Sequence, residues 1–337
     1  MITTLLAGVV SASTLAAAPS TAAPVVPDRT LRVYSNNIEN LVLNSSTDSS
    51  DGDNLCDRVS GPEHLTSMLV DDSGRSGTSG VVAPDLLILQ QVRGQGQADA
   101  YADQLSAKLG YAAGTYKAIV VWQDPAPWGG SHHCATAALG DLKKRQTNGI
   151  VYNSARLSLT ARSDYWSAGW LPTDATYRNG DGCKLYKDAE GAQSDGPGAD
   201  QEKWRRTSAI AATFTVKATG TTVFAATMHL PEENGKNACA GNGDTGIGGT
   251  GIHLGASATD LLRSSTIRVI GMDADRTGIP ASTLGGYGLQ GYGTGATDGS
   301  SKIDYLFVRG SVQPSSVGYT VAGTRSNHRA LYSFIDF

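Results

Sequence analysis

The sequence predicts a mixed α/β sandwich, in which two β-sheets pack face to face and helices cover the outside. Segments with the pattern of strands outnumber helical segments by a wide margin, and helical segments recur between the strands. We find no internal repeat and no linker that would divide the chain, so we expect a single domain over residues 29–337. The 41 glycines indicate many turns and long loops, as in other strand-rich proteins.

The elements follow from short apolar or alternating runs that end in turn residues. Residues 31–40 form a strand pattern that ends in asparagines, and Leu86 to Leu89 is a continuous apolar run typical of a strand buried on both faces. Further strands are predicted at 116–122, 148–154, 207–216, 222–230, 267–275, 302–310 and 331–337. Helices are predicted at 61–70, 97–110 and 254–265, long polar insertions at 163–203 and 232–252, and a Gly/Tyr loop at 285–295.

The last strand has the alternation of a half-buried strand. Leu331, Ile335 and Phe337 would face one side of it, and Tyr332 and Phe334 the other. The polar turn Ser326-Asn327-His328 stands just before this run. The question is whether His328 only fills space in the structure or acts as a base in catalysis.

The composition is that of an ordinary folded protein, because 40% of the residues are hydrophobic and can supply a buried core. The 27 basic and 31 acidic residues give a net charge of −4. This mildly acidic balance gives no support for a broad basic surface that binds nucleic acid, although it leaves room for a local one.

The first residues are apolar and small, with no charge before Asp28, and residues 1–23 read as a secretory signal peptide. The apolar part is too short and too rich in serine to span a bilayer, and alanines near Ala18 and Ala22 offer cleavage sites. No basic residue precedes the apolar stretch, which departs from the usual pattern. We still expect a secreted, extracellular monomer without a transmembrane segment.

Four cysteines are widely spaced, and none belongs to the C-x-x-C pair of a structural zinc site. In an exported protein two disulfides are the natural interpretation, and the sequence leaves all three pairings open. The residues are Cys56, Cys134, Cys183 and Cys239.

Polar side chains stand where the predicted strands end. In a layered sheet protein such ends can converge on one rim, where loops carry the chemistry. Taken singly, each residue is explained as well by a turn that makes local backbone hydrogen bonds. The residues are Asn37, Gln91, His229, Asp273, Asp275, Asp304, Asn327 and His328.

Their joint order matches the motif set of one family, with "LRVYSNNI", "PDLLILQQV", "NGIVYN", "FAATMHL", "IGMDAD", "KIDYLFV" and "SNHRAL" near the expected spacing. The chain resembles the endonuclease/exonuclease/phosphatase superfamily from about Leu31 to Phe337. Each motif is only moderately specific, and the assignment depends on several of them in register. The resemblance implies a deoxyribonuclease-I-like fold with two mixed sheets flanked by helices in four layers.

The resemblance also assigns roles to the first three positions. Asn37 matches the asparagine that closes the first strand and orients the metal ligands and the phosphate. Gln91 falls where the family has the glutamate of its "LQE" motif, the principal metal ligand. His229 matches the histidine that donates to the scissile phosphate.

The remaining positions belong to three later motifs. Asp273 and Asp275 fall on the family's D-x-N pair, whose aspartate activates or positions the attacking water. Asp304 matches the aspartate of the "IDY" motif, which pairs with the last histidine. Asn327 and His328 fall on the terminal "SDH". His328 is therefore expected to be the catalytic histidine and Asp304 its orienting partner, with Asn327 and Asp275 near the substrate.

Three of these positions differ from the family. Gln91 offers one neutral carbonyl oxygen where glutamate offers two charged ones, so the affinity for a hard cation such as Mg²⁺ should fall. Asn327 removes a negative charge beside His328, and Asp275 adds one back. The site keeps about three carboxylates in place of about four. Most of the negative charge of the site is therefore kept, at changed positions.

The resemblance implies a divalent cation, Mg²⁺ first and Mn²⁺ or Ca²⁺ as alternatives, held by Gln91, Asp273, Asp275 and Asp304. On this reading the protein is a secreted phosphodiesterase of the nuclease or phospholipase C/sphingomyelinase type, in which water attacks phosphorus. Its substrate would be nucleic acid or phospholipid. The alternative is a catalytically impaired homologue that binds a phosphorylated ligand or a protein partner. A phosphomonoesterase would share the site and differ only in pocket depth.

Two features bear on the substrate. Arg205 or Arg206 precedes a predicted strand where the family often has a phosphate-contacting arginine, and we assign this role to Arg206. A solvated arginine at the rim explains the same residue equally well. Tyr165, Trp166 and Trp170 are expected in a loop, where they could touch a membrane, stack on bases or pack over a sheet.

Overall fold

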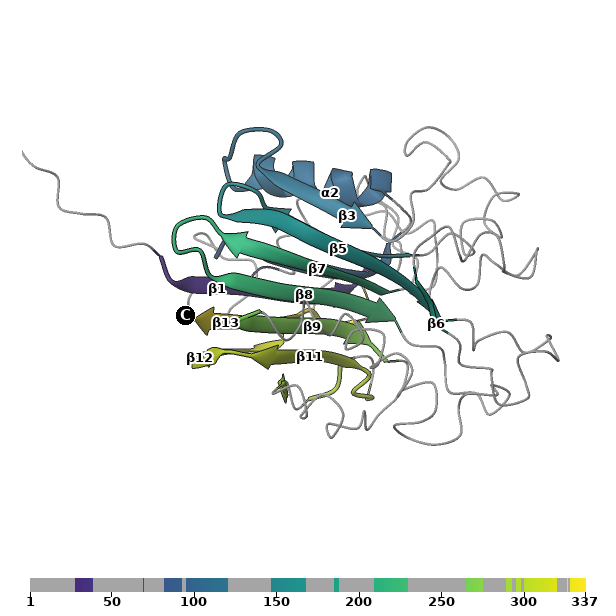
Figure 1. The fold of residues 1–337 in the computed structure, drawn as a ribbon. Coiled ribbons are helices and arrows are strands. Elements are labelled where there is room, and N and C mark those ends of the chain that lie inside the picture. The colour runs from purple at the N-terminus through teal and green to yellow at the C-terminus, as the bar shows by residue number, and fades with distance from the viewer. Residues whose placement is uncertain are drawn as a thin grey trace, which may run out of the picture.

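Two β-sheets pack face to face, and a helix covers the outer side of one of them (Figure 1). This computed structural model describes residues 28–38, 69, 82–92, 95–120, 147–167, 185–187, 209–229, 265–274, 289–292, 295–297, 300–319, 326 and 328–337.

The first sheet contains six strands among the described residues, in the order β12-β13-β1-β2-β4-β3. β1 and β2 run parallel, and the other neighbouring pairs run antiparallel. The strands are β1 (Thr30–Asn37), β2 (Leu86–Val92), β3 (Tyr116–Val120), β4 (Thr147–Asn153), β12 (Ser311–Tyr319) and β13 (Leu331–Asp336).

The second sheet contains seven strands of the described chain, in the order β10-β11-β9-β8-β7-β5-β6. Here β8 and β9 form the parallel pair, and all other pairs are antiparallel. The strands are β5 (Leu157–Ser167), β6 (Leu185–Lys187), β7 (Ala209–Val216), β8 (Thr222–His229), β9 (Ile267–Asp273), β10 (Gln290–Tyr292) and β11 (Asp304–Arg309).

Two apolar clusters hold these layers together. The first lies between the sheets and is lined by alternate residues of both, such as Ile88, Phe214 and Val269. The second lies between the first sheet and α2 (Gln95–Lys108), whose buried side chains include Tyr101 and Leu105. Burial of these side chains is the main force that stacks the layers. No helix in the described part of the chain is long and apolar enough to cross a membrane.

The predicted sandwich is confirmed, together with the buried strand around Leu86–Leu89 and the helix at 97–110. The alternation in β13 is also confirmed, because Leu331 and Ile335 face the inter-sheet cluster while Tyr332 and Phe334 face the α2 side. The predicted helices at 61–70 and 254–265 lie almost entirely outside the described residues, and so does the insertion at 232–252.

Four strands differ from the sequence prediction. β5 and β6 occupy parts of the predicted 163–203 insertion, so placing Tyr165 and Trp166 in a loop was wrong. β10 lies inside the predicted Gly/Tyr loop, and β12 was not predicted. β6, β10 and β12 are edge strands, where short length, glycine or a proline such as Pro314 is tolerated and weakens the sequence pattern.

The two sheets approach closely around Gly271 of β9. A Cβ at this position would lie 2.8 Å from Cγ2 of Ile88 and 2.9 Å from Cβ of Ser35, and closer still to the Ser35 hydroxyl. A side chain larger than hydrogen therefore does not fit between β9 and the β1–β2 pair.

A buried polar connection crosses the interface beside this glycine. Gln90 Nε2 donates to Thr227 Oγ1 at 3.0 Å and to Ser35 Oγ at 3.3 Å, and Thr227 Oγ1 donates to the Leu89 carbonyl at 3.1 Å. These bonds join β1 and β2 of one sheet to β8 of the other. They fix how the sheets are placed, because buried polar groups tolerate few alternative pairings.

A second buried polar group lies where β2 begins, beside the first residues of β1. Asp85, which is 1% exposed, precedes β2, accepts from the Arg32 backbone N–H at 2.9 Å and pairs with Arg156 Nε at 2.9 Å. Desolvation by burial outweighs the attraction of Arg156 and raises the pKa of Asp85 to about 6.

This pKa shift predicts a pH dependence of stability. Because the folded-state pKa lies above the ordinary value of 3.8, the fold favours protonated Asp85, and ionisation reduces stability as the pH rises from about 4 to about 6. We expect wild type to lose up to ~3 kcal/mol of unfolding free energy relative to Asp85→Asn over this interval, as measured by urea denaturation. The exposed Asp103, changed to Asn, is the control. A constant difference between wild type and Asp85→Asn across this pH range would contradict the assignment.

Candidate active site

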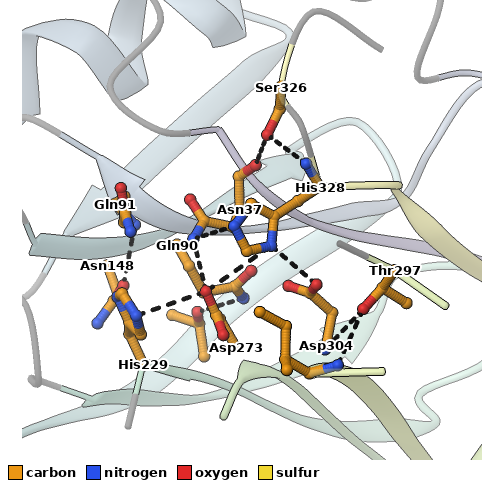
Figure 2. Close-up of polar contacts among 12 residues, drawn as sticks. Asn37, Gln90, Gln91, Asn148, His229, Asp273, Thr297, Asp304, Ser326 and His328 are labelled. Atoms are coloured by element: carbon orange, nitrogen blue, oxygen red, sulfur yellow. Dashed lines mark hydrogen bonds and ion pairs between the residues drawn. The ribbon is translucent and has the colours of Figure 1, made fainter. Parts of the chain in front are cut away.

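Five polar side chains from both sheets meet at one rim of the sandwich: Asn37, His229, Asp273, Asp304 and His328, here called the rim cluster (Figure 2). All five are buried. The topology explains the convergence, because the parallel pairs β1–β2 and β8–β9 both end at this rim and the antiparallel β11 and β13 begin there.

Within the second sheet, three members of the rim cluster are neighbours across strands. His229 is the register partner of Asp273 in the parallel β8–β9 pair, and Asp304 is the register partner of Asp273 in the antiparallel β9–β11 pair. Register partners share a face of the sheet, so the three side chains point to the same side.

Asp273 is the centre of the rim cluster and is fully buried, with 0% exposure. Its Oδ2 accepts a hydrogen bond from Asn37 Nδ2 at 2.6 Å. The same oxygen lies 3.4 Å from Nε2 of His229 and 3.8 Å from Nδ1 of His328. One carboxylate oxygen therefore faces an amide and two imidazoles that come from both sheets.

His328 and Asp304 form the shortest contact between a ring and a carboxylate in the rim cluster. Nδ1 of His328 lies 2.8 Å from Oδ2 of Asp304, and Nε2 of His328 lies 3.4 Å from Nδ2 of Asn37. The second oxygen of Asp304, Oδ1, is buried and has no hydrogen-bond partner among the described residues. An unpartnered buried carboxylate oxygen is costly, so this atom is a candidate ligand for a cation.

Two neighbouring side chains hold the His328 backbone against β1. Ser326 Oγ donates to the Asn37 carbonyl at 2.6 Å and accepts from the His328 N–H at 3.1 Å. Asn36 Nδ2 donates to the His328 carbonyl at 3.2 Å. The position of His328 is thus fixed by the same strand that supplies Asn37.

Thr297 is a further residue of the site, and the sequence reasoning missed it. Its Oγ1 accepts from the backbone N–H groups of Asp304 at 2.9 Å and Ile303 at 3.1 Å, and its carbonyl accepts from the Arg329 N–H at 2.8 Å. Thr297 thereby connects the start of β11 to the residue after His328. A threonine in a Gly-rich loop carries no sequence signal that would have revealed this.

Gln91 lies at a β-bulge. The register of β2 with β4 shifts between Leu89 and Val92, and both of these residues pack on the α2 side. Regular alternation would put residues three apart on opposite sides, so one extra residue is inserted between them. Gln91 is that residue: it has φ of 53°, and its N–H donates to Asn148 Oδ1 at 3.3 Å.

The bulge determines where Gln91 sits relative to the rim cluster. In the parallel β1–β2 register Asn37 faces Gln90, so Gln91 lies one residue beyond, at the rim end of β2, with 7% exposure. A left-handed backbone at a non-glycine residue is rare, and such outliers concentrate at functional sites.

No sequence family and no curated protein matches the chain. Solved structures do match, among them the catalytic domain of human Nocturnin, determined with a bound sulfate anion. Its TM-score is 0.51 at 13% identity, over 92% of this chain and 94% of that one. The chain has the endonuclease/exonuclease/phosphatase fold.

Two bacterial proteins with this fold give similar values. A Bacteroides vulgatus endonuclease/exonuclease/phosphatase has a TM-score of 0.51 at 13% identity, over 91% of this chain and 98% of its own. An endonuclease/exonuclease/phosphatase from Beutenbergia cavernae has a TM-score of 0.51 at 14% identity, over 92% of this chain and 72% of its own. At such low identity the likeness establishes the endonuclease/exonuclease/phosphatase fold alone.

Members of this fold are expected to carry a divalent cation, and the rim cluster fits one. Ligand atoms of Asp273, Asp304 and His328 lie within 4.8 Å of one another, and all three residues are buried. The unpartnered Oδ1 of Asp304 is a further observation that a cation would satisfy.

Several predicted residues lie outside the described part of the chain. They are Asp275, Arg205, Arg206 and Asn327 of the predicted site, Trp170, and the cysteines Cys56, Cys134, Cys183 and Cys239. Residues 1–23 of the predicted signal peptide also lie outside it.

Proposed function

We propose that this protein is a secreted phosphoric ester hydrolase that depends on a divalent cation and acts on a phosphodiester. The observation that carries the proposal is the central place of Asp273, whose Oδ2 faces Asn37 at 2.6 Å and His229 at 3.4 Å. A buried carboxylate beside an amide and an imidazole is an arrangement that can position a water molecule next to a phosphoryl group.

Each member of the rim cluster has a distinct part in this proposal. Asp273 holds the attacking water and accepts its proton. His229 and His328 donate to phosphoryl oxygens, on which charge grows in the transition state. Asp304 orients His328 through the 2.8 Å contact with Nδ1, and Asn37 fixes the Asp273 carboxylate. A divalent cation held by Asp273 and Asp304 would neutralise charge on the phosphoryl group.

Residues outside the described ranges extend the proposal. Asp275 is proposed as a cation or substrate ligand, Asn327 and Arg206 as substrate contacts, and the four cysteines as two disulfides. Gln91, at the bulge, is proposed as a weak neutral ligand. The substrate would be a nucleic acid or a phospholipid, cleaved by a monomer of one domain, residues 29–337.

The experiment is a hydrolysis panel on purified protein. Bis-p-nitrophenyl phosphate, p-nitrophenyl phosphate, plasmid DNA and sphingomyelin vesicles are each incubated with Mg²⁺, Mn²⁺, Ca²⁺ or EDTA. We expect turnover of at least one diester that EDTA abolishes and an added cation restores. Turnover of the monoester alone would make the protein a phosphomonoesterase. Absence of turnover on all four substrates would favour the alternative, a catalytically impaired homologue that binds a phosphorylated ligand or a protein partner. The neutral side chain of Gln91 is the best argument for that alternative.

A further inference from the structure

We propose that Arg329 contacts a second phosphate beside the scissile one, and that the substrate is therefore a nucleic acid strand and not a choline phospholipid. This inference rests on the proposed function, because it names the substrate class of the same site. Its test is the binding of an oligonucleotide, which is measured without turnover and so succeeds or fails independently of hydrolysis.

The first support is the exposure of Arg329 beside the rim cluster. Residues 328–335 are all buried except Arg329, which is half-buried. Its neighbours His328 and Ala330 are 6% and 0% exposed. A charged side chain is rarely buried without a partner, so at this place in a buried segment Arg329 keeps its charge in contact with solvent. Arg329 therefore presents a cation at the edge of the site.

The second support is the fixed position of the Arg329 backbone. Its N–H donates to the Thr297 carbonyl at 2.8 Å. Oγ1 of the same threonine accepts from the Asp304 N–H at 2.9 Å, as Figure 2 shows. The carbonyl of the preceding residue, His328, accepts from Asn36 Nδ2 at 3.2 Å. These hydrogen bonds hold position 329 next to Asp304 and His328.

The register of β13 with β1 leads to the same place. Leu331 is the partner of Ser35 in this antiparallel pair, and the same register counted two residues further sets Arg329 opposite Asn37. Partners across an antiparallel pair have Cα atoms about 4.5–5.5 Å apart. The Asn37 amide donates to Asp273, which is proposed to hold the attacking water. Position 329 is therefore adjacent to the place of the phosphoryl group.

The third support is the charge of Arg329 itself. Its guanidinium makes no hydrogen bond or ion pair with the described part of the chain, where only its backbone N–H is bonded. At the opposite end of the sandwich, by contrast, Arg156 pairs with both Asp28 and Asp85. A guanidinium is a planar fork of five donors that matches the geometry of a phosphate. The donors of Arg329 are therefore available for an anionic ligand.

The chemistry of the two proposed substrates decides between them. A nucleic acid strand carries a phosphate for about every 3.4 Å of helix axis, so a further anion lies beside the one that is cleaved. Sphingomyelin has a single phosphate, next to a quaternary ammonium that a guanidinium repels. The net charge of −4 gives the protein no general attraction for a polyanion, so a local cation beside the site has to supply it.

The test is fluorescence anisotropy of a labelled phosphorothioate oligothymidylate of about twelve nucleotides with Mg²⁺ present. Its linkages keep their charge and resist hydrolysis. We expect Arg329→Met to weaken binding at least ~10-fold, and to make the slope of log K against log salt shallower by about 0.7, the value for one phosphate contact on a single strand.

Lys302→Met is the matched control. It removes the same charge two residues from Asp304, but the Lys302 ammonium lies 4.9 Å from the centroid of the Tyr305 ring. This variant should change the affinity for the oligonucleotide by less than about twofold, because an exposed charge away from the strand is screened by salt.

A second probe distinguishes a contact with a neighbouring phosphate from a disturbance of His328. It is an oligomer of the same length with one phosphate and neutral methylphosphonate linkages elsewhere. Wild type should bind this probe more weakly than the fully charged one, and Arg329→Met should lose at least ~5-fold less affinity for it. Circular dichroism checks that each variant is folded, and Arg329→Gln replaces Arg329→Met if the latter is not.

Four results would overturn the proposal. They are unchanged binding in Arg329→Met, equal weakening by Arg329→Met and Lys302→Met, equal loss on both probes, and a wild-type protein that binds sphingomyelin vesicles but no oligonucleotide. Oligonucleotide binding that depends on Arg329 in a protein that hydrolyses nothing would uphold the phosphate contact and reject the proposed hydrolase. Hydrolysis of a diester without that dependence would do the reverse, so the two failures are separable.

Discussion

We expect Asp273→Asn to lower kcat for diester hydrolysis by about 10³-fold or more, while the protein remains folded. The substitution keeps the shape of the side chain and removes its charge and its ability to accept a proton. General-base catalysis contributes typically 10²–10⁴-fold, so the loss of this one function accounts for the expected drop. The effect is larger than at other positions because Oδ2 of Asp273 faces Asn37, His229 and His328 at once.

The chain offers a matched control for this variant in Asp85→Asn. Asp85 is also a buried aspartate at the end of a central strand, but it lies at the opposite end of the sandwich and pairs with Arg156. Its replacement should leave kcat within about twofold of wild type when both proteins are folded. Steady-state kinetics with circular dichroism measures both variants. Equal losses at Asp273 and Asp85 would mean that activity depends on stability and not on the rim cluster.

Gly271→Ala should strongly destabilise the interface between the two sheets. The added methyl would lie 2.8 Å from Cγ2 of Ile88 and 2.9 Å from Cβ of Ser35, inside van der Waals contact. β9 and the β1–β2 pair would have to move apart, which would also strain the nearby Gln90–Thr227 hydrogen bond of 3.0 Å. Overpacking of this kind costs ~1–3 kcal/mol, and a backbone shift in two sheets places the loss of unfolding free energy at the upper end.

Urea denaturation of a double-mutant cycle tests the cause. Ser35→Ala removes the hydroxyl oxygen nearest to the new methyl, so the double variant Ser35→Ala/Gly271→Ala should lose less stability than the sum of the two single losses. We expect a coupling of at least ~1 kcal/mol, which is within the range for residues in contact. A Gly271→Ala protein within ~0.5 kcal/mol of wild type would show that the sheets do not meet as closely as described.

The sequence predicts the central strands well because their patterns come from burial. Leu86–Leu89 is apolar without interruption since β2 is covered by β9 and β8 on one face and α2 on the other. β12 could not be predicted in this way. Its sequence is SVQPSSVGY; in the described part of the chain it lies at an edge, pairs with β13 alone and carries a register shift between Val312 and Val317. An edge strand is held by its partner strand, here β13, and its own side chains then need little of the burial that produces a recognisable pattern.

The polar residues of the rim cluster could be selected from sequence, but the contacts that position them could not. All five members of the rim cluster stand at the ends of predicted strands. The register between neighbouring strands then decides which of these side chains meet. The bulge that inserts Gln91 depends on Asn148 of another strand. The attachment of Asp304 to the His328 segment depends on Thr297, which no periodicity marks.

The place of β13 in the first sheet has a consequence for the order of folding during synthesis. β13 lies between β1 and β12. The Thr30 hydroxyl donates a hydrogen bond to Oδ1 of Asp336, a residue 306 positions later in the chain. Until residues 331–336 have left the ribosome, one side of β1 lacks its neighbour, and unpaired strand edges promote aggregation. Strands that are far apart in the sequence also pair slowly during folding. Because His328 lies just before β13, its imidazole can take its place in the rim cluster only once β13 has paired with β1.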